Sequence, residues 1–329
     1  MTSTKIFNIT KIKASNKNSQ NLNKESLKDS TSSSSNNSNN PNYKIINTTS
    51  LNEYFRIEES RKLVLKNNIN LNSFLFENPF PKNFLKKHNS INDIRIKMID
   101  WMIDIFSSYK SSPKTFFLSV NIMDLFFLKT KRTIQINDIH IIGLCSIFIA
   151  SKMEDLFPLR LEQIKKILGK NKFSYENIKY VEKEILFTIK FDIVKFTIYD
   201  FVNSLLFDFE VKYKNQILFV NDLFFTYKNI CFFICKLIYY NEDFCFYKNQ
   251  LKVISIFLIA LDILKAITNV NNEIEVFFRN WIFYIMNNTN SNKKKIEIIY
   301  EKIASLYQNI TSGKFGDCNL LKTHKLIVF

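Results

Sequence analysis

Apolar residues recur at helical spacing from Leu51 onward. A short amphipathic segment, LNEYFRIEESR, comes first and places Leu51, Tyr54 and Phe55 on one side of a helix. A loop that carries Pro79 and Pro81 follows it. The pattern then predicts five helical stretches, at about Ile91–Tyr109, Pro113–Leu128, Asn137–Asp155, Leu161–Leu168 and Tyr175–Ile189.

The same arrangement repeats after the segment FDIVKF. Five more helices are predicted, at about Thr197–Phe207, Ile217–Tyr239, Tyr247–Ile267, Ile274–Met286 and Lys293–Gln308. Two successive five-helix units without visible sequence repetition predict an all-α fold. We expect residues 1–50 to be a disordered tail, 51–195 the first unit with its leading helix, 196–312 the second unit and 313–329 a C-terminal tail.

Composition supports a helical fold with a disordered beginning. The chain has only four glycines and five prolines, so glycine-rich phosphate loops and frequent turns are not expected. Residues 1–50 are rich in Ser, Asn and Lys and contain few large apolar side chains, which cannot offset the entropy lost on ordering. We therefore place the folded part of the chain after this tail.

The net charge of +16 is spread along the whole chain. Because lysines rarely alternate with aromatic residues on one face, nucleic acid is not the expected partner. The five cysteines show no paired CxxC spacing, so we expect reduced thiols, no metal and no cofactor. A secretory signal and a membrane span are not expected either, because charges interrupt every long apolar run.

Four motifs, in matching order and spacing, resemble the cyclin box. They are IRIKMIDW at residues 94–101, SVNIMDLF at 119–126, IASKMEDLFP at 149–158 and YENIKYVEKEILFTIKFDI at 175–193. The resemblance implies two tandem cyclin folds and a protein without catalytic activity, which binds and activates a cyclin-dependent serine/threonine kinase. The leading helix and Trp101 are closest in style to the A/B-type cell-cycle cyclins, and we expect a location in the nucleus, the cytoplasm or both.

The resemblance also implies a kinase-binding surface. Lys152 and Glu182 would form a polar pair that hydrogen-bonds the kinase, although an ordinary solvated ion pair remains an alternative from the residues alone. Apolar residues around this pair would complete the contact. They are Met153, Leu186, Phe191 and Ile193, with Leu51 and Tyr54 of the leading helix adding a second contact.

Two further features of the first predicted helix carry expectations. The resemblance implies a salt bridge inside the box between Arg95 and Asp124, and a charge flanked by large apolar residues needs such a partner. It also implies a face that docks Arg-x-Leu substrate motifs. That face comprises Ile94, Met98, Trp101 and Asp104, but Lys97 and His140 replace the expected apolar residue and glutamine, and Lys97 would repel the arginine of the motif.

Three other functions remain alternatives. A transcription-associated cyclin would share the same fold. A DNA-binding general transcription factor with cyclin folds would share the basic charge, but the tail has no cysteine for a zinc ribbon. An enzyme built around Lys152, Glu154 and Asp155 would lack a nucleophile elbow or an HExxH motif.

Overall fold

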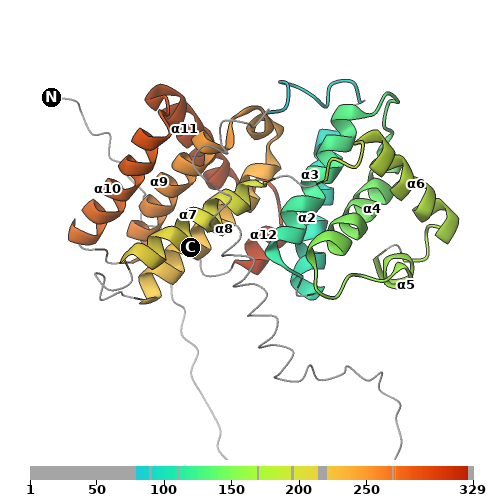
Figure 1. Cartoon of the computed structure of the whole chain (residues 1–329), viewed down its shortest axis with the longest axis horizontal. Helices are drawn as coiled ribbons and strands as arrows, with labels where there is room; N and C mark the ends of the chain where they lie inside the picture. The colour runs from blue at the N-terminus through green and yellow to red at the C-terminus, as the bar shows by residue number, and fades with distance from the viewer. Residues whose placement is uncertain are drawn as a thin grey trace, which may run out of the picture. The chain divides into compact units, whose positions relative to one another are not determined.

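The computed structural model describes residues 79–88, 91–109, 111–168, 170–193, 196–213, 221–268, 270 and 272–324. The expected tail over residues 1–50 and the expected leading helix with Leu51 and Tyr54 lie outside the described residues. Within the described ranges all regular structure is helical, so the fold class is all-α. Figure 1 shows the helices and their labels.

The first helical set consists of the elements α2 to α6. Their bounds are α2 Asn92–Tyr109, α3 Pro113–Lys129, α4 Ile136–Glu154, α5 Leu161–Gln163, the π-helical turn η2 Ile164–Leu168 and α6 Tyr175–Thr188. Two helices start at serine caps: the Ser112 hydroxyl accepts from the Lys114 amide at 3.3 Å ahead of Pro113, and the Ser174 hydroxyl accepts from the Asn177 amide at 3.0 Å.

Helix α4 is the centre of the first set, packing against α2, α3 and α6. It is buried nearly all round from Ile139 to Ser151 because few polar side chains interrupt its apolar sequence. Gly143 allows α2 to come close, since a Cβ at this position would collide with the side chain of Met98. By length and composition α4 could cross a membrane, but 67% of the apolar stretch is buried against the rest of the protein, as in core helices.

The second helical set repeats this plan around α9. Its elements are α7 Ile198–Tyr213, α8 Asn221–Leu237, the 3₁₀ turns η3 Ile238–Tyr240 and η4 Glu242–Phe246, α9 Asn249–Ile267, α10 Asn272–Asn288 and α11 Lys293–Thr311. Helix α9 packs against α7, α8, α10 and α11, and most of its residues from Leu251 to Leu264 are buried. Each set therefore surrounds one apolar helix with amphipathic neighbours, which is consistent with two tandem five-helix folds.

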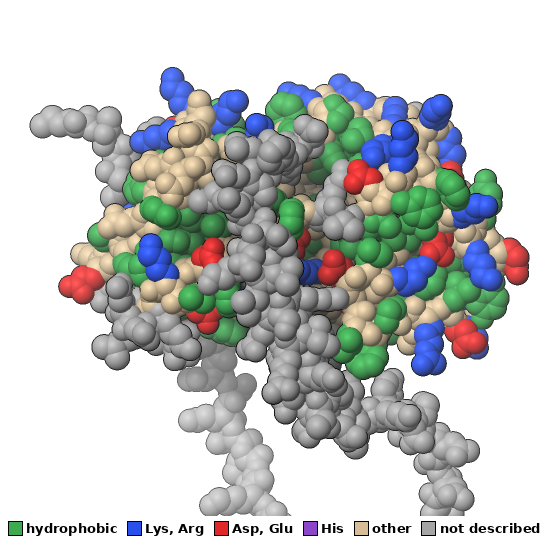
Figure 2. Space-filling model, in the orientation of Figure 1, with side chains coloured by type: hydrophobic (Ala, Val, Ile, Leu, Met, Phe, Trp, Pro, Cys, Tyr) green, Lys and Arg blue, Asp and Glu red, His purple; other side chains and the backbone are tan. Residues whose placement is uncertain are grey.

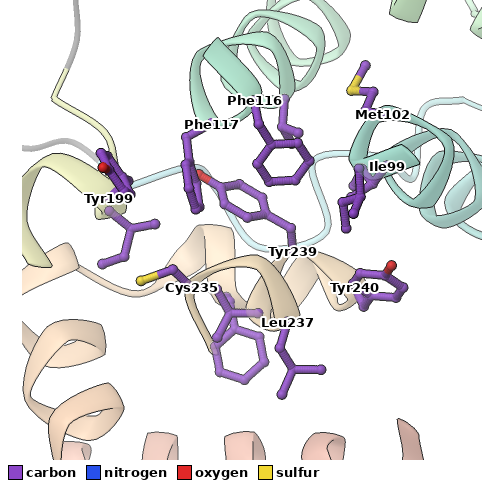
Figure 3. Packing of buried hydrophobic residues seen from close by; sticks show 14 of the residues in the cluster. Ile99, Met102, Phe116, Phe117, Tyr199, Cys235, Leu237, Tyr239 and Tyr240 are labelled. Carbon is purple, nitrogen blue, oxygen red and sulfur yellow. The ribbon is translucent and has the colours of Figure 1, made fainter. Parts of the chain in front are cut away.

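Aromatic side chains join the two sets. Figure 3 shows Tyr239 of η3 pointing between Phe116 and Phe117 of α3, with Tyr199 of α7 beside Phe117. The ring centroid of Tyr239 lies 6.3 Å from that of Phe116 and 5.8 Å from that of Phe117, and Phe117 stacks on Tyr199 at 5.2 Å. Large buried rings in such arrangements add to the free energy gained from apolar burial.

A short helix, α12 (Asn319–Thr323), lies in the segment where only a tail was expected. It packs on α2 because Asp100 caps its N-terminus: the carboxylate accepts from the Asn319 amide at 2.8 Å and from the Leu320 amide at 3.4 Å. The hydroxyl of Tyr240 donates to the same carboxylate at 2.5 Å. This docking joins residues more than two hundred positions apart, which helical periodicity in the sequence cannot reveal.

Two predicted helices differ in the structure. The stretch predicted over Leu161–Leu168 is one α-helical turn followed by a π-helical turn. Helix α7 continues to Tyr213, six residues beyond the predicted end, because Phe209 is 1% exposed, stacks on Phe224 and Phe278 and meets Trp281 edge-on. Tertiary packing thus extends a helix whose later residues include several charges.

Candidate functional site

Lys152 and Glu182 meet on the surface of the first helical set. Lys152 lies in the last turn of α4 and Glu182 lies in the middle of α6, and their side chains form an ion pair. The Lys152 ammonium also lies 4.0 Å from the centroid of the Phe148 ring. The side chains are 40% and 15% exposed, so the pair is partly desolvated and still accessible to a partner.

The four apolar residues expected around this pair lie at different depths. Met153 and Phe191 are 44% and 57% exposed, whereas Leu186 is half-buried and Ile193 is buried. Ile193 therefore supports the surface from beneath instead of forming part of it. Leu51 and Tyr54, the other expected contacts, lie outside the described residues.

Phe191 is presented by an unusual turn at the end of α6. Lys190 and Phe191 both have positive φ angles, 59° and 56°, which are uncommon for residues with a Cβ. Hydrogen bonds from the Phe191 amide to the Leu186 carbonyl (2.9 Å) and from the Lys190 amide to the Phe187 carbonyl (3.1 Å) hold the turn. The turn places the Phe191 ring 5.5 Å from the ring of Phe187.

More large apolar side chains are exposed in the first helical set than the motifs indicated. They include Leu156 (42% exposed), Phe157 (72%), Tyr180 (68%) and Phe187 (61%). Figure 2 shows hydrophobic and basic side chains intermixed on the side where Figure 1 places α4, α5 and α6. Tyr180 and Phe187 share a face of α6 with Lys183, so large apolar residues on a polar helix face were the sequence signal for them.

Asp155 has a structural role directly after α4. Its carboxylate accepts hydrogen bonds from the Thr115 hydroxyl at 2.6 Å, from the Ser151 hydroxyl at 2.8 Å and from the Ser112 amide at 3.1 Å. Lys152, also considered for acid–base catalysis, is paired with Glu182. Among the described residues, no group of three or more His, Cys, Asp or Glu side chains is placed to hold a metal ion.

Arg95 and Asp124 form a buried ion pair between α2 and α3. Both guanidinium–carboxylate hydrogen bonds, Nε to Oδ1 and Nη2 to Oδ2, are 2.6 Å long, and Nη1 donates to the Tyr239 carbonyl at 2.8 Å. Burial alone would lower the pKa of Arg95, but the neighbouring Asp124 carboxylate raises it above its ordinary value. Arg95, which was expected to pair only with Asp124 in the first helical set, therefore also connects α2 to the second helical set.

The expected substrate-docking face is only partly exposed. Met98 is 6% exposed because it packs into the space beside Gly143, so it belongs to the core. Ile94 and Trp101 are half-buried and Asp104 is exposed. Lys322 of α12 lies close enough to Asp104 for this carboxylate to contribute to its raised pKa, after the larger effect of its hydrogen bond to Asp317. Lys322 thus lies near the Asp104 carboxylate, which belongs to the face expected to bind the arginine of an Arg-x-Leu motif.

The first helical set lies within a match to a known protein family. Residues 68–194 match the family model described as "Cyclin, N-terminal domain". This match covers α2 to α6 and thus includes Lys152, Glu182, Arg95 and Asp124. The X-ray structure of a viral cyclin from herpesvirus saimiri aligns with 75% of this chain and 95% of its own, at 16% identity and a TM-score of 0.47.

Several similar proteins are mitotic cyclins. Cyclin-B1-1 of Arabidopsis thaliana is 27% identical over 37% of this chain and 28% of its own length, and the G2/mitotic-specific cyclin-A of Hydra viridissima is 26% identical over 42% and 32%. The G2/mitotic-specific cyclin-4 of Saccharomyces cerevisiae is 29% identical over 30% and 21%. The chain thus spans about a third or less of the length of these relatives. The chain thus contains a region, residues 68–194, that matches the N-terminal domain of cyclins, and over part of its length it is similar to mitotic cyclins.

Proposed function

We propose that the protein is a regulatory subunit, without catalytic activity of its own, that binds and activates a cyclin-dependent serine/threonine kinase. The observation that carries the proposal is the accessible Lys152–Glu182 ion pair, together with exposed Met153 and Phe157 at and after the end of α4 and exposed Phe191 after the end of α6. A partly desolvated pair surrounded by apolar side chains is suited to gripping the backbone of a partner helix or loop.

The proposed mechanism is conformational. Bound at this surface, a helix of the kinase would rotate inward, complete the lysine–glutamate pair that orients ATP and free the activation loop. Apolar contacts at the edge of the interface with the kinase would exclude water, which strengthens the polar contacts at the centre of that interface. The chain contributes binding energy and leaves the phosphoryl transfer to the kinase.

The proposed setting is control of the cell cycle, in the nucleus, the cytoplasm or both. The names of the relatives, which describe G2 and mitotic cyclins, favour this setting over a role as a transcription-associated cyclin. No comparable observation favours the DNA-binding alternative, for which strongly salt-dependent binding to duplex DNA would be the signature.

The test is a titration of a cyclin-dependent kinase catalytic subunit with the purified chain, measuring both affinity and phosphorylation of a substrate. Lys152→Ala combined with Glu182→Ala removes charge-assisted hydrogen bonds worth about 1.5 to 3 kcal/mol each, so affinity should fall by at least about one order of magnitude. Phe157→Ala should also weaken binding, because this side chain is 72% exposed and adds apolar contact area.

A matched control is available in the second helical set. Lys302 and Asp243 form an ion pair at 2.9 Å with side chains 39% and 38% exposed, and removing both should leave kinase affinity unchanged. Equal affinity of the wild type and a folded Lys152/Glu182 double variant would refute the site. Phosphoryl transfer from ATP by the isolated chain would refute the non-catalytic role.

A further inference from the structure

Lys236 lies in the last turn of α8, where the second helical set meets the first. Its ammonium nitrogen is 3.3 Å from Nε2 of His324, the residue that follows α12, and 5.9 Å from the centroid of the Phe116 ring in α3. Figure 1 shows α12 between α8 and α2. The Lys236 side chain is only partly exposed, so much of this cation is removed from water.

Lys236 has no carboxylate partner among the described residues. Lys228 lies two helical turns earlier in α8, and its ammonium is 3.9 Å from a carboxylate oxygen of Glu210 in α7. The two lysines of this helix therefore differ: one is compensated by an acidic side chain, and the other is held by an imidazole and a phenyl ring. Removing a charge from water without a counter-charge raises its free energy.

The titratable groups that face Lys236 in the described part of the chain are His324 and Cys235. Burial and then the charge of Lys236 lower the pKa of His324 to about 3, so its imidazole stays neutral and accepts from the ammonium. Burial raises the pKa of the Cys235 thiol, although Lys252 of α9 and Lys236 lower it, so this thiol is neutral as well. Neither neighbour supplies a negative charge.

Burial without a counter-charge favours the uncharged form of the Lys236 amine. It lowers the pKa of this amine from its ordinary value of 10.5 to about 8. At pH 7.5 about a quarter of the Lys236 side chains then carry a free lone pair, against about one in a thousand for an ordinary lysine. Desolvation is one of the ways in which proteins activate a lysine amine as a nucleophile.

We propose that Lys236 is a site of N-acylation by acyl thioesters. The lone pair of the uncharged amine attacks the thioester carbonyl carbon, and a C–N bond forms as the C–S bond breaks. The released thiolate takes the proton that the amine loses, so no oxidant or reductant takes part. The product is a neutral amide at the point where α3, α8 and the segment after α12 meet.

The surroundings of the amine favour a small apolar acyl group such as acetyl. Phe116 lies on one side, and the His324 ring on the other packs edge-on against Phe233 with ring centroids 5.4 Å apart. A succinyl group is less suited, because the reaction neutralises the Lys236 charge that could have paired with its second carboxylate.

This inference does not depend on kinase binding. Lys236 lies in α8, whereas Lys152 and Glu182 lie in α4 and α6. Acylation is measured on the chain alone, so failure of either proposal leaves the other intact.

The test treats the full chain with S-acetyl-N-acetylcysteamine, a small acetyl thioester, and follows each lysine by mass spectrometry of proteolytic peptides. At pH 7.5 Lys236 should react about tenfold faster than Lys228, because its larger share of uncharged amine outweighs the lower nucleophilicity of a less basic group. Lys228 is the matched control, since it lies on the same helix and is also partly exposed. The rate at Lys236 should level off above about pH 8.

A pair of variants separates charge from packing. His324→Glu places a carboxylate beside Lys236, which favours the ammonium and should slow acetylation of Lys236 by about tenfold or more. His324→Gln keeps a neutral hydrogen-bond acceptor and should change the rate by about threefold or less. Melting temperatures show whether both variants fold, and if His324→Glu does not, the pH profile of the wild type decides.

Three results would overturn the proposal. The first is acetylation of Lys236 in the folded wild type that is no faster than that of Lys228. The second is equal slowing by His324→Glu and His324→Gln, which would make the effect one of packing. The third is a rate at Lys236 that still rises tenfold between pH 8 and pH 9, as for an ordinary lysine.

Discussion

The two helical sets share a plan but differ in what they bury and expose. The first set buries the Arg95–Asp124 ion pair, and most of its exposed large apolar residues lie in the segments that follow α4 and in or after α6. The second set is packed around Phe209, whose ring contacts Phe224, Phe277, Phe278 and Trp281. Its exposed apolar residues are spread over several helices.

On the proposed function, this difference separates a binding unit from a supporting unit. Aromatic packing stabilises a core without desolvating charges, so it suits a scaffold. A buried ion pair adds little net stability but makes the loss of either partner costly, and here the same arginine also binds the Tyr239 carbonyl of the second set. The first set thus combines the proposed partner surface with a polar connection to the second set.

The largest effect is expected from breaking the buried ion pair. Arg95→Ala leaves the Asp124 carboxylate, a residue 1% exposed, without its partner and should lower the free energy of unfolding by about 3 to 5 kcal/mol. Urea unfolding measures this loss. Arg132, which pairs with Glu184 and Asp138 at the surface, is the control, and Arg132→Ala should lower stability by about 1 kcal/mol or less. Similar losses of unfolding free energy in the two variants would contradict the expected difference between a buried and a surface ion pair.

A smaller effect is expected from the aromatic core of the second set. Phe209→Leu keeps an apolar side chain but removes the ring contacts, so the free energy of unfolding should fall by about 1 to 2 kcal/mol. The same urea titration measures it. If the second set is only a support, kinase affinity of the folded variant should equal that of the wild type, and a large loss of affinity would give this set a direct part in binding.

The smallest effect is expected from mild acid. Burial lowers the pKa of His88, His140 and His324, the last to about 3, from the ordinary value of 6.5. The unfolded chain therefore binds more protons below about pH 6.5, so stability should be complete above that pH and decrease as the pH falls. Between pH 7 and pH 6 the loss for His324 should stay below about 1 kcal/mol. Melting temperatures across this range measure the slope.

Replacing His88 and His324 one at a time tests whether these two side chains cause the pH dependence. His88, in the turn before α2, is held neutral, since Nε2 donates to the Phe127 carbonyl at 2.7 Å and Nδ1 accepts from the Ile134 amide at 3.1 Å. His324 lies 3.3 Å from the Lys236 ammonium, beside the second set. Both His88→Gln and His324→Gln should flatten the pH dependence, and a slope unchanged in both would contradict the assigned pKa shifts.

The sequence by itself determined the helical class, the order of the helices and most of their bounds. Helical periodicity is local: apolar residues three and four positions apart mark the buried face, and Pro113 marks a helix start. The motifs around Lys152 and Glu182 likewise pointed to one surface, because residue types at matched spacing lie on neighbouring helices of a known fold.

Only the tertiary structure decided which distant residues meet. It showed that Met98 is buried beside Gly143, that Asp100 caps α12, and that Trp101, His140 and Phe173 form one row. It also showed the Arg95 hydrogen bond to the Tyr239 carbonyl, across 144 positions of the chain. These contacts depend on how whole helices pack, and packing is set by the shape and volume of all neighbouring side chains together, which no local pattern along the chain encodes.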